Sequence, residues 1–447
     1  MKHLIWMFGL FFGCLIIGIC YVQRTGVEKI KTLPKYCEKN CNISEIADYG
    51  NGHYVIRIEN ATENGYEKYL KQLEYAGFKK HSDNGEDAME GNILTASFRR
   101  KEMVVTVSHA IHIGETYISA SEQIGLSNHL VKIKNITKGE RMKSQTSLHM
   151  LELNNNGACF VIQLKNGHFV IHDGGHEYDA PYLMDYLESL AGEGEKPVVE
   201  GWFISHAHSD HHGALLEIMN RKKWRDRIYV DGIYFAEPPL EFVCKTKYDT
   251  YQDIADLTKN YHLLKNSEHQ SCKLYRPQLG QRYYFCDIYI DVALTPEQFI
   301  LDASCKKDFN ETSVWLMNHI EGQKVLLVGD TNHTGMRTAM KMLDKAYFQI
   351  DAYAVSHHGV NVYDYFTDIL DVKTLLYSNW RIGSLWQDGS KYARTKENKH
   401  LIQHAREAYS HESGTVVLKF PYVVGEAYVT GKTNWIYNGG RKREVFE

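Results

Sequence analysis

Residues 43–145 show the mixed periodicity of a small α+β module. The run HYVIRIE (53–59) alternates hydrophobic and polar positions as a strand does, and NILTASFRR (92–100) and MVVTVSHAI (103–111) predict a pair of strands. After the first of these strands and before the pair, NGYEKYLKQLEYAGF (64–78) repeats its hydrophobic residues with helical spacing. The module contains no recognisable catalytic or metal-binding motif. Its sequence therefore predicts no more than a role in positioning substrate or as a spacer.

From about residue 146 onward, strands and helices alternate along the chain. Short hydrophobic runs bounded by turn residues predict strands, and runs with helical spacing lie between them. The strands are expected at 158–164, 168–175, 199–205, 227–236, 281–285, 288–294, 313–320, 325–330, 352–356, 374–379 and 415–420. The helices are expected at 180–191, 213–223, 247–265, 335–344, 362–370 and 397–408. This order predicts an α/β domain over residues 146–447 that follows the α+β module.

The N-terminus carries a segment that is long and apolar enough to span a membrane. Leu4–Val22 holds nineteen residues without a charge, flanked by Lys2 and Arg24, and about 20 apolar residues cross a bilayer as a helix. Residues 1–24 therefore predict a single-pass transmembrane signal anchor, followed by a polar linker at 25–42. A cleaved signal peptide, which would give a secreted protein, is the alternative. Both readings export the C-terminal bulk of the chain.

Composition places few limits on function. The formal net charge of −4 over 447 residues argues against a general nucleic-acid coat, but it leaves a local basic groove open. The nine cysteines include no paired C-x-x-C set, so a structural zinc knuckle is not expected. Cys37 and Cys41 lie four residues apart and are either a disulfide of the exported chain or two unpaired thiols.

The densest chemistry lies in FISHAHSDHHGAL (203–215), where a predicted strand runs into a predicted helix. His206, His208, Asp210 and His211 follow the pattern H-x-H-x-D-H, and imidazole and carboxylate are the usual ligands of zinc and related divalent ions. The first two histidines alternate at the strand end and can face one ion, while Asp210 and His211 can face a second ion beside it. Burying so many polar groups without metal would cost free energy, so the pattern predicts a metal centre.

This motif resembles that of the metallo-beta-lactamase superfamily, whose later motifs follow in order over residues 150–425. The resemblance implies an α/β fold of the αββα sandwich type, with further site residues at three strand ends. VIHDGG supplies Asp173, which would support the ligands from behind, and VLLVGD supplies Asp330, which would bridge two ions. AVSHHG supplies His357 as the last ligand of the second ion, with His358 as the alternative.

One branch of the superfamily is especially similar: the extracellular hydrolase domain of ComEC-type DNA-uptake proteins, together with cell-wall phosphorylcholine esterases. The run NETS, from Asn310 to Ser313, and the double histidine with its glycine carry this resemblance and imply that Asn310 and Ser313 contact substrate or ligands. Val360 stands where the branch usually has serine. Many superfamily members have a further first-site histidine, for which His262 and His269 are the candidates. A site without that ligand would hold metal more loosely, or prefer manganese to zinc.

The resemblance implies a hydrolase with two divalent metal ions, zinc first and manganese as the alternative. A metal-activated hydroxide would attack phosphorus or a carbonyl carbon, with Asp210 orienting the nucleophile and Asp330 bridging the ions. Because such a site concentrates positive charge, an anionic phosphodiester is the expected substrate, in nucleic acid or in a cell-wall polymer. His176 near the expected site mouth is either a proton donor to the leaving group or a loop histidine. RKKWRDR (221–227) would steer phosphate, with Trp224 stacking, or form a solvated helix end.

Two other functions stay open on the same residues. An ester, lactone or sulfate-ester hydrolase would use the same centre, since a fold does not fix a reaction. A non-catalytic binding protein has no need of both Asp210 and Asp330, so the intact motif argues against it. The expected location is the cell membrane, with the hydrolase domain outside the cell, and secretion is the alternative. No protein partner is predicted, and ComEC itself is excluded because the sequence has one membrane segment and no channel.

Overall fold

In the computed structural model, the described part of the chain folds into three large β-sheets, a two-stranded ribbon and their flanking helices. The structure describes residues 32–49, 52–84, 88–122, 124–132, 144–239, 272–297, 308–379, 395–430, 434–438 and 441–445. The apolar segment Leu4–Val22, the helix expected at 247–265, and the candidates His262 and His269 lie outside these residues. Within the described ranges, no helix has the length and hydrophobicity needed to cross a membrane.

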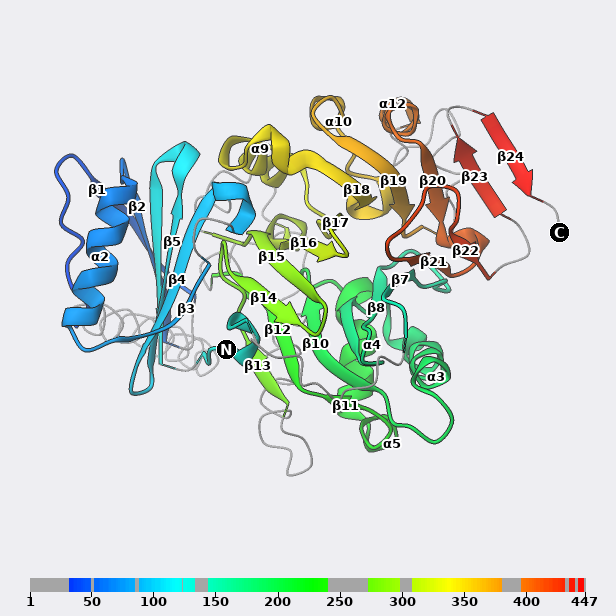
Figure 1. Cartoon of the computed structure of the whole chain (residues 1–447), viewed down its shortest axis with the longest axis horizontal. Helices are drawn as coiled ribbons and strands as arrows, with labels where there is room; N and C mark the ends of the chain where they lie inside the picture. The colour runs from blue at the N-terminus through cyan, green and yellow to red at the C-terminus, as the bar shows by residue number, and fades with distance from the viewer. Residues whose placement is uncertain are drawn as a thin grey trace, which may run out of the picture.

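The first sheet is antiparallel throughout and carries helix α2 (Glu63–Tyr75) on one face (Figure 1). Its strands, in the spatial order β1-β2-β6-β5-β4-β3, are β1 (Asn42–Asp48), β2 (His53–Glu59), β3 (Lys79–Asp83), β4 (Ile93–Arg100), β5 (Met103–Ala110) and β6 (Glu115–Ser121). The helix begins after Thr62, whose hydroxyl accepts the Gly65 N–H at 3.1 Å as an N-cap. Leu73 of the helix and Phe98 of the sheet lie in one buried cluster. The predicted helix and three strands of this module are confirmed.

The second and third sheets face each other. The second, in the order β13-β12-β10-β9-β8-β7-β21-β22 with β11 beside β10, consists of β7 (Ser147–Met150), β8 (Cys159–Gln163), β9 (Phe169–Asp173), β10 (Val198–Ile204), β11 (Tyr229–Val230), β12 (Gly232–Phe235), β13 (Lys273–Tyr275), β21 (Val416–Lys419) and β22 (Tyr428–Val429). The third, in chain order, consists of β14 (Arg282–Phe285), β15 (Ile288–Leu294), β16 (Trp315–Ile320), β17 (Gln323–Leu327), β18 (Gln349–Ala354), β19 (Asp371–Tyr377) and β20 (Glu407–Ser410). The ribbon pairs β23 (Asn434–Asn438) with β24 (Arg441–Val445).

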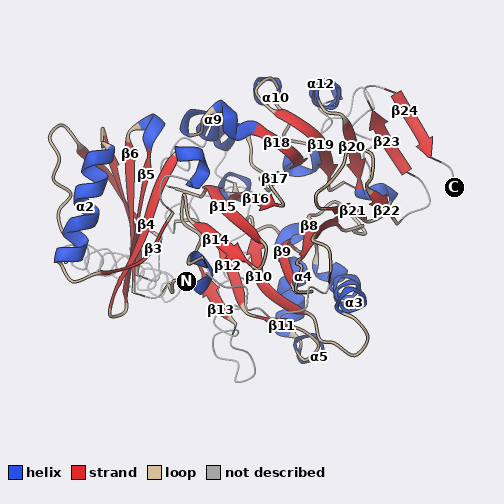
Figure 2. Cartoon of the chain, in the orientation of Figure 1, coloured by secondary structure: helices blue, strands red, loops and turns tan. Residues whose placement is uncertain are grey.

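Helices cover the outer faces of both sheets, so the layers run helix, sheet, sheet, helix (Figures 1 and 2). The second sheet is covered by α3 (Ala180–Ala191), α4 (Ser209–Asn220) and α5 (Lys222–Arg225), and the third by α9 (His333–Met342), α10 (Asp364–Thr367) and α12 (Thr395–His404). Strand β10 shows the division, because Trp202 and Ile204 pack with α3 and α4 whereas Phe203 packs with Ile290 and Leu316 of the third sheet. The predicted αββα fold class is confirmed for the part of the chain from β7 onward.

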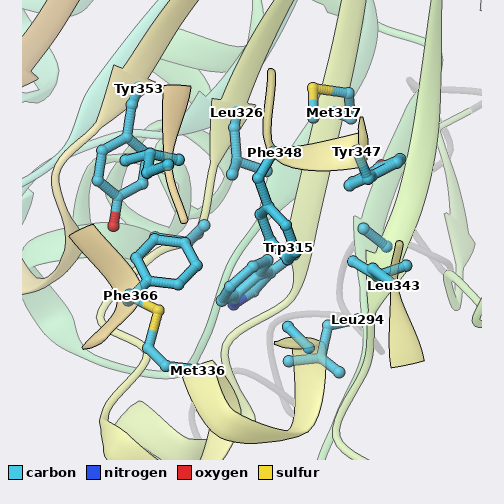
Figure 3. Close-up of a cluster of buried hydrophobic side chains, with 14 of the residues drawn as sticks. Leu294, Trp315, Met317, Leu326, Met336, Leu343, Tyr347, Phe348, Tyr353 and Phe366 are labelled. Carbon is cyan, nitrogen blue, oxygen red and sulfur yellow. The ribbon is translucent and has the colours of Figure 1, made fainter. Parts of the chain in front are cut away.

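The hydrophobic core between the third sheet and its helices supports the turn that carries Asp330. Figure 3 shows Trp315 of β16 close to Met336 of α9 and Phe366 of α10. The Trp315 indole N–H donates to Thr331 Oγ1 at 2.7 Å, so this buried ring leaves no unsatisfied donor. Thr331 directly follows Asp330, and the packed core therefore fixes the end of the turn that carries this carboxylate.

The α+β module is held against the sandwich by shared packing and hydrogen bonds. Ile93 of the module lies in the same buried cluster as Leu294 of the third sheet. The hydroxyls of Thr95 and Ser108 both donate to the Leu279 carbonyl, at 2.8 and 2.6 Å. The module is therefore a fixed neighbour of the third sheet, and its role in substrate positioning or spacing stays a prediction.

Three predicted elements have different bounds in the structure. The helix expected at 397–408 ends at His404 and gives way to β20, in which buried Glu407 accepts the Thr374 hydroxyl of β19 at 2.7 Å. The strand expected at 227–236 divides at Asp231 into β11 and β12, which both run parallel to β10. The helix expected at 213–223 begins already at Ser209. In each case pairing with a distant strand or a turn, rather than local periodicity, decides the boundary.

Candidate metal centre

The histidine motif occupies the connection between β10 and α4. Strand β10 ends at Ile204 and helix α4 begins at Ser209, at the edge where the parallel strands β9 and β10 end. Ser205 fixes this connection, because its N–H donates to Asp173 Oδ1 at 2.8 Å and its carbonyl accepts the Val314 N–H at 3.0 Å. The second of these bonds joins the two sheets of the sandwich directly beside the motif.

His206, His208 and Asp330 form a first group of residues that could hold a metal ion. The Nε2 atom of His206 lies 2.9 Å from His208 Nδ1 and 3.8 Å from Asp330 Oδ2. His206 and Asp330 are buried, and His208 is half-buried. Two imidazole nitrogens so close to each other and to a carboxylate suit donors arranged around one cation.

Asp210, His211, Asp330 and His358 form a second group. His211 Nε2 lies 3.1 Å from Asp330 Oδ1, and His358 Nε2 lies 3.2 Å from Asp210 Oδ2. Asp330 therefore belongs to both groups, with Oδ2 toward His206 and Oδ1 toward His211. Asp330 is thus the residue that both groups share, and its bridging of two ions stays a prediction.

The outer nitrogen of each ring in the second group has a fixed acceptor. His211 Nδ1–H donates to Asp173 Oδ2 at 2.8 Å, and His358 Nδ1–H donates to the Ser378 carbonyl at 2.9 Å. Because a carboxylate and a carbonyl can only accept, these contacts place a proton on Nδ1 of each ring and direct Nε2 toward the carboxylates of the group. Nε2 can therefore donate to a carboxylate as part of an imidazolium, or lose its proton and bind a cation.

Asp173, expected to support the ligands from behind, lies at the end of β9. Its Oδ2 accepts from His211 and also from the Ser205 hydroxyl, at 2.9 Å. Its backbone has a φ of +59°, a left-handed conformation that aspartate tolerates better than most residues. Such a conformation costs about 1–3 kcal/mol, which these buried hydrogen bonds offset. The carboxylate therefore orients His211 without facing a cation itself.

The two histidines of SHHG differ in their relation to the centre. Both lie in the short turn η7 (Ser356–Gly359) with φ values of 50° and 55°. His358 is 4% exposed and belongs to the second group. His357 lies outside that group, with Nε2 3.5 Å from Asp330 Oδ2 and a side chain that is 30% exposed. The sequence prediction put His357 first and His358 as the alternative, whereas the structure brings His358 into the group and leaves His357 at its open rim.

The carboxylates of the centre stabilise positive charge inside it. Burial alone would raise the pKa of Asp330 and of Asp210, but the neighbouring histidines outweigh burial and lower both values. Burial alone would lower the pKa of His211, but the carboxylates of Asp330 and Asp173 raise it well above its ordinary value. Carboxylates gathered at one buried point stabilise positive charge, whether as protons on imidazole or as divalent cations.

The residues present fit divalent cations of the zinc type. His211 Nε2 is buried and forms no hydrogen bond of good geometry, although it lies 3.1 Å from Asp330 Oδ1. A cation held by both atoms would satisfy them. Imidazole nitrogens and carboxylate oxygens surround His211 Nε2, as zinc and similar ions prefer. Binding of two ions, and zinc over manganese, stay predictions.

A small cavity adjoins the centre and is lined in part by its residues. Its volume is about 20 Å³, and its lining includes Asp173, His211 and Leu316. That space holds about one water molecule. The side chains of Asp210 and His357 are 23% and 30% exposed, so the centre is open to solvent at these two residues.

The remaining predicted residues lie around the centre in different ways. Ser313 Oγ accepts the Asp330 N–H at 3.1 Å and so supports the shared carboxylate through its backbone. Asn310 lies in the turn η5 (Phe309–Thr312) with a buried Oδ1 that makes no hydrogen bond, and its contact with substrate stays a prediction. His176 Nε2–H donates to the Asn156 carbonyl at 3.0 Å, outside both groups, which favours the loop-histidine reading.

The basic run 221–227 does not form a phosphate groove at the centre. It follows α4, and Arg221 comes ten residues after His211 of the motif, which is about 15 Å along the helix axis. Arg227 pairs with Glu188 and Asp185, and Trp224 is only 8% exposed. Because the Trp224 ring packs into the buried cluster under α3 and α4, the structure favours the reading of this run as a helix end over stacking of a base on Trp224.

Ser205 and Gly329 are site residues that sequence reasoning missed. Gly329 has a φ of +55°, and a Cβ at this position would lie 2.8 Å from Ser205 Cβ and 3.0 Å from Ser313 Oγ. The missing side chain lets the end of β17 approach the end of β10, which brings Asp330 to the histidines. A glycine directly before the aspartate in VLLVGD was the available signal.

The αββα layers and a His/Asp centre at the strand ends define a metallohydrolase-type domain. Residues 154–359 match the model of the metallo-beta-lactamase superfamily, a range that includes both groups. This match supports a domain similar to that superfamily over these residues, while the ComEC-type branch stays a prediction. No curated protein matches the sequence.

Solved structures with a similar fold share little sequence with the chain. The metallo-beta-lactamase fold protein YhfI from Bacillus subtilis is 11% identical, with 52% of this chain and 85% of that chain covered and a TM-score of 0.32. A metallo-beta-lactamase from Cronobacter sakazakii with a HARLDQ motif is 12% identical, with 57% and 87% covered and a TM-score of 0.30. Tm1679, a metal-dependent hydrolase of the beta-lactamase superfamily, is 13% identical, with 61% and 98% covered and a TM-score of 0.34.

Proposed function

We propose that the chain is a metal-dependent phosphodiesterase that acts through this centre. The observation that carries the proposal is Asp330, whose two carboxylate oxygens lie 3.1 Å from His211 Nε2 and 3.8 Å from His206 Nε2. A carboxylate between two nitrogen-rich groups is the arrangement that a pair of catalytic cations needs. His206 and His208 would hold one cation, and Asp210, His211 and His358, which form the other group, would hold the second.

The side chains of the centre have different proposed roles, which depend on whether they are exposed or buried. Bound cations supply an activated nucleophile at neutral pH and neutralise charge that develops on the reacting oxygens. Asp210, partly exposed on the open side, is placed to orient the attacking water and to accept its proton. Asp173 holds the ring of His211, and Ser313 holds the backbone of Asp330. These supporting bonds keep the donors in place before substrate arrives.

A phosphodiester suits the centre better than a neutral ester. Two cations at a partly open point would concentrate positive charge, and an anionic phosphodiester would gain from it in both the ground state and the transition state. Nucleic acid and a wall polymer bearing phosphorylcholine are the two sources of this chemistry that the ComEC-type resemblance implies. An ester, lactone or sulfate-ester substrate would use the same residues. The assay below distinguishes these substrates from a phosphodiester.

We also propose that the hydrolase domain is exported and held at the cell membrane by its N-terminal segment. Support comes from the uncharged run Leu4–Val22 between Lys2 and Arg24. Protease added to intact cells should degrade the hydrolase domain. Protection of the domain in intact cells, with degradation only after lysis, would contradict export.

The activity is tested with the full-length chain and matched chromogenic substrates. Bis-p-nitrophenyl phosphate, p-nitrophenylphosphorylcholine, a p-nitrophenyl sulfate and a lactone panel are compared, each with Zn²⁺ and with Mn²⁺. We expect metal-dependent turnover of a phosphodiester, abolished by Asp330→Asn. The variant Asp371→Asn, at an exposed position at the start of β19, is the matched control and should keep full activity.

Three other results of this assay would contradict the proposal. Turnover of the lactones or of the sulfate ester alone would replace the phosphodiesterase by the alternative hydrolase. Bound metal without turnover of any substrate would favour a binding protein. Equal phosphodiester turnover in Asp330→Asn and the wild type would show that the centre is not the site of the reaction.

A further inference from the structure

A third His/Asp group lies on helices α10 and α12 and shares no residue with the centre. Among the described residues, Asp368, His400 and His404 bring one ligand atom each within 4.8 Å of one another. His400 and His404 are four residues apart on α12, so they share one face of the helix. Asp368 is the C-cap residue of α10. The group therefore joins two separate helices of the outer layer.

The three side chains are already oriented toward one another. His400 Nε2 lies 2.9 Å from Asp368 Oδ1, and the two imidazole rings have centroids 4.3 Å apart. His404 Nδ1–H donates to the His400 carbonyl at 2.8 Å. Because a carbonyl can only accept, the proton lies on Nδ1 and the Nε2 lone pair stays available, as in metal-bound histidines.

A simple surface ion pair would explain only part of this arrangement. One histidine is enough to pair with Asp368, but a second histidine at the next helical turn adds a third donor held by its own backbone bond. The side chains of His400 and Asp368 are 32% and 60% exposed, so an ion can enter and water can complete its coordination. Two imidazoles with one carboxylate suit zinc, nickel, cobalt or copper better than magnesium or calcium.

We propose that Asp368, His400 and His404 form a further cation site, which takes an ion of the zinc class and ties α12 to α10. Neither the family motif nor the proposed hydrolysis uses these residues. The ion would crosslink two short helices whose own packing is limited by their lengths, and it would stabilise the folded chain in proportion to its affinity.

The position of α12 gives this site a structural link to the centre. Asn398, two residues before His400, donates from Nδ2 to the Gly359 carbonyl at 2.9 Å and accepts the Tyr377 hydroxyl at 3.0 Å. Gly359 ends the turn η7, which carries His358. An ion at the α12 site therefore steadies the support of this turn without contacting the reacting groups.

The site is tested by zinc content in the full-length chain. Each protein is dialysed against the same buffered free Zn²⁺, and bound zinc is measured by elemental analysis. We expect His404→Ala and Asp368→Asn each to bind about one zinc ion per chain less than the wild type. Lys399→Ala, an exposed change on the same helix, is the control and should bind as much zinc as the wild type. The zinc-induced rise in melting temperature should also be smaller in His404→Ala than in Lys399→Ala.

Equal zinc content in His404→Ala and Lys399→Ala would overturn the proposal. Both substitutions are at exposed positions, and far-ultraviolet circular dichroism confirms that each variant is folded before its zinc is counted. The result is independent of the proposed function, because loss of one zinc ion from His404→Ala supports the site whether or not a phosphodiester is cleaved. Conversely, failure of every hydrolase assay leaves this zinc count unaffected.

Discussion

At the scale of single residues, Asp330 depends on contacts made by its backbone as well as by its carboxylate. Ser313 Oγ accepts its N–H at 3.1 Å, and Asn361 Nδ2 donates to its carbonyl at 3.0 Å. An ionised carboxylate that is 2% exposed would be strongly destabilising without nearby positive charge. The histidines supply that charge as imidazolium when protons occupy the centre, and cations supply it when metal is bound.

Asp173→Asn tests the support of the ligands from behind. Asparagine tolerates the same left-handed backbone, but it cannot accept from Ser205 and His211 with two anionic oxygens, so His211 loses its fixed orientation. We expect metal affinity or turnover to fall about 10- to 100-fold, with a lower melting temperature because the buried hydrogen bonds of Asp173 are weakened. Metal titration and steady-state kinetics measure both effects, and wild-type values for affinity and turnover would contradict this role.

The two neighbouring histidines of SHHG are separated by paired alanine substitutions. His358→Ala removes a buried donor of the second group, whereas His357→Ala removes a side chain at the open rim. We expect His358→Ala to weaken binding of the second ion by more than about 100-fold, and His357→Ala to leave two ions bound. Stoichiometry by elemental analysis decides between them. Loss of an ion from His357→Ala alone would restore the original sequence prediction.

At this scale the sequence predicts which residues meet, but not which of two neighbours faces the centre. The spacing of His206, His208, Asp210 and His211 places all four at one strand end, and the structure brings them together. The choice between His357 and His358 depends on two successive positive φ values in η7, which residue types alone do not reveal.

At the scale of elements, the centre forms where two sheets bring their strand ends together. The Val314 N–H donates to the Ser205 carbonyl at 3.0 Å and links the end of β10 to the start of β16. Gly329 at the end of β17 is packed against Ser205 from the other sheet. The distance between these strand ends therefore sets how closely Asp330 approaches the histidines of the motif.

Gly329→Ala should disturb this approach, and Gly322→Ala is its matched control. Both glycines have positive φ, +55° and +77°, and an alanine at either position costs about 1–3 kcal/mol of stability. Only at Gly329 would the new Cβ meet other atoms, 2.8 Å from Ser205 Cβ, whereas nothing lies within 4 Å at Gly322.

We expect Gly322→Ala to lower the free energy of unfolding and to keep turnover. We expect Gly329→Ala to lower the free energy of unfolding by more, and to lower turnover as well. Denaturant unfolding and kinetics of the two variants make the comparison. Equal turnover in the two variants would show that the close approach of β17 and β10 does not matter to the centre.

Local periodicity predicts most of these elements because their buried faces repeat along the chain. It misses β20, where the pairing of Glu407 with Thr374 of β19 overrides a helical pattern. It also misses the break at Asp231, because two strands that both pair with β10 look like one hydrophobic run.

At the scale of the whole molecule, the sandwich buries several histidines away from the ligand groups. Burial lowers the pKa of His149 to about 4, with a smaller contribution from Lys419, and it lowers the pKa of His411 to about 3. Both rings are therefore neutral in the folded chain near pH 6, where an unfolded histidine begins to take up a proton.

Stability should fall as pH decreases below about 6.5. The unfolded chain binds the proton of His149 from its ordinary pKa near 6.5, while the folded chain binds it only near pH 4. Between pH 7 and pH 4 this histidine alone should cost about 3 kcal/mol of unfolding free energy. Denaturant melts of His149→Gln should show a flatter pH profile than the wild type, and parallel profiles would contradict this assignment.

The order of motifs predicts the αββα class, but not how the α+β module docks. The bonds from Thr95 and Ser108 to the Leu279 carbonyl join residues that are more than a hundred positions apart. Polar residues in a strand show no preference for one distant partner, so such a contact has no local signal in the sequence.

A crystal structure of the full-length chain grown with Zn²⁺, with anomalous scattering recorded at the zinc edge, tests the central claim most directly. We predict two neighbouring peaks that share the Asp330 carboxylate, one bound by His206 and His208 and the other by Asp210, His211 and His358. A single peak, or zinc bound to these histidines without Asp330, would contradict the account.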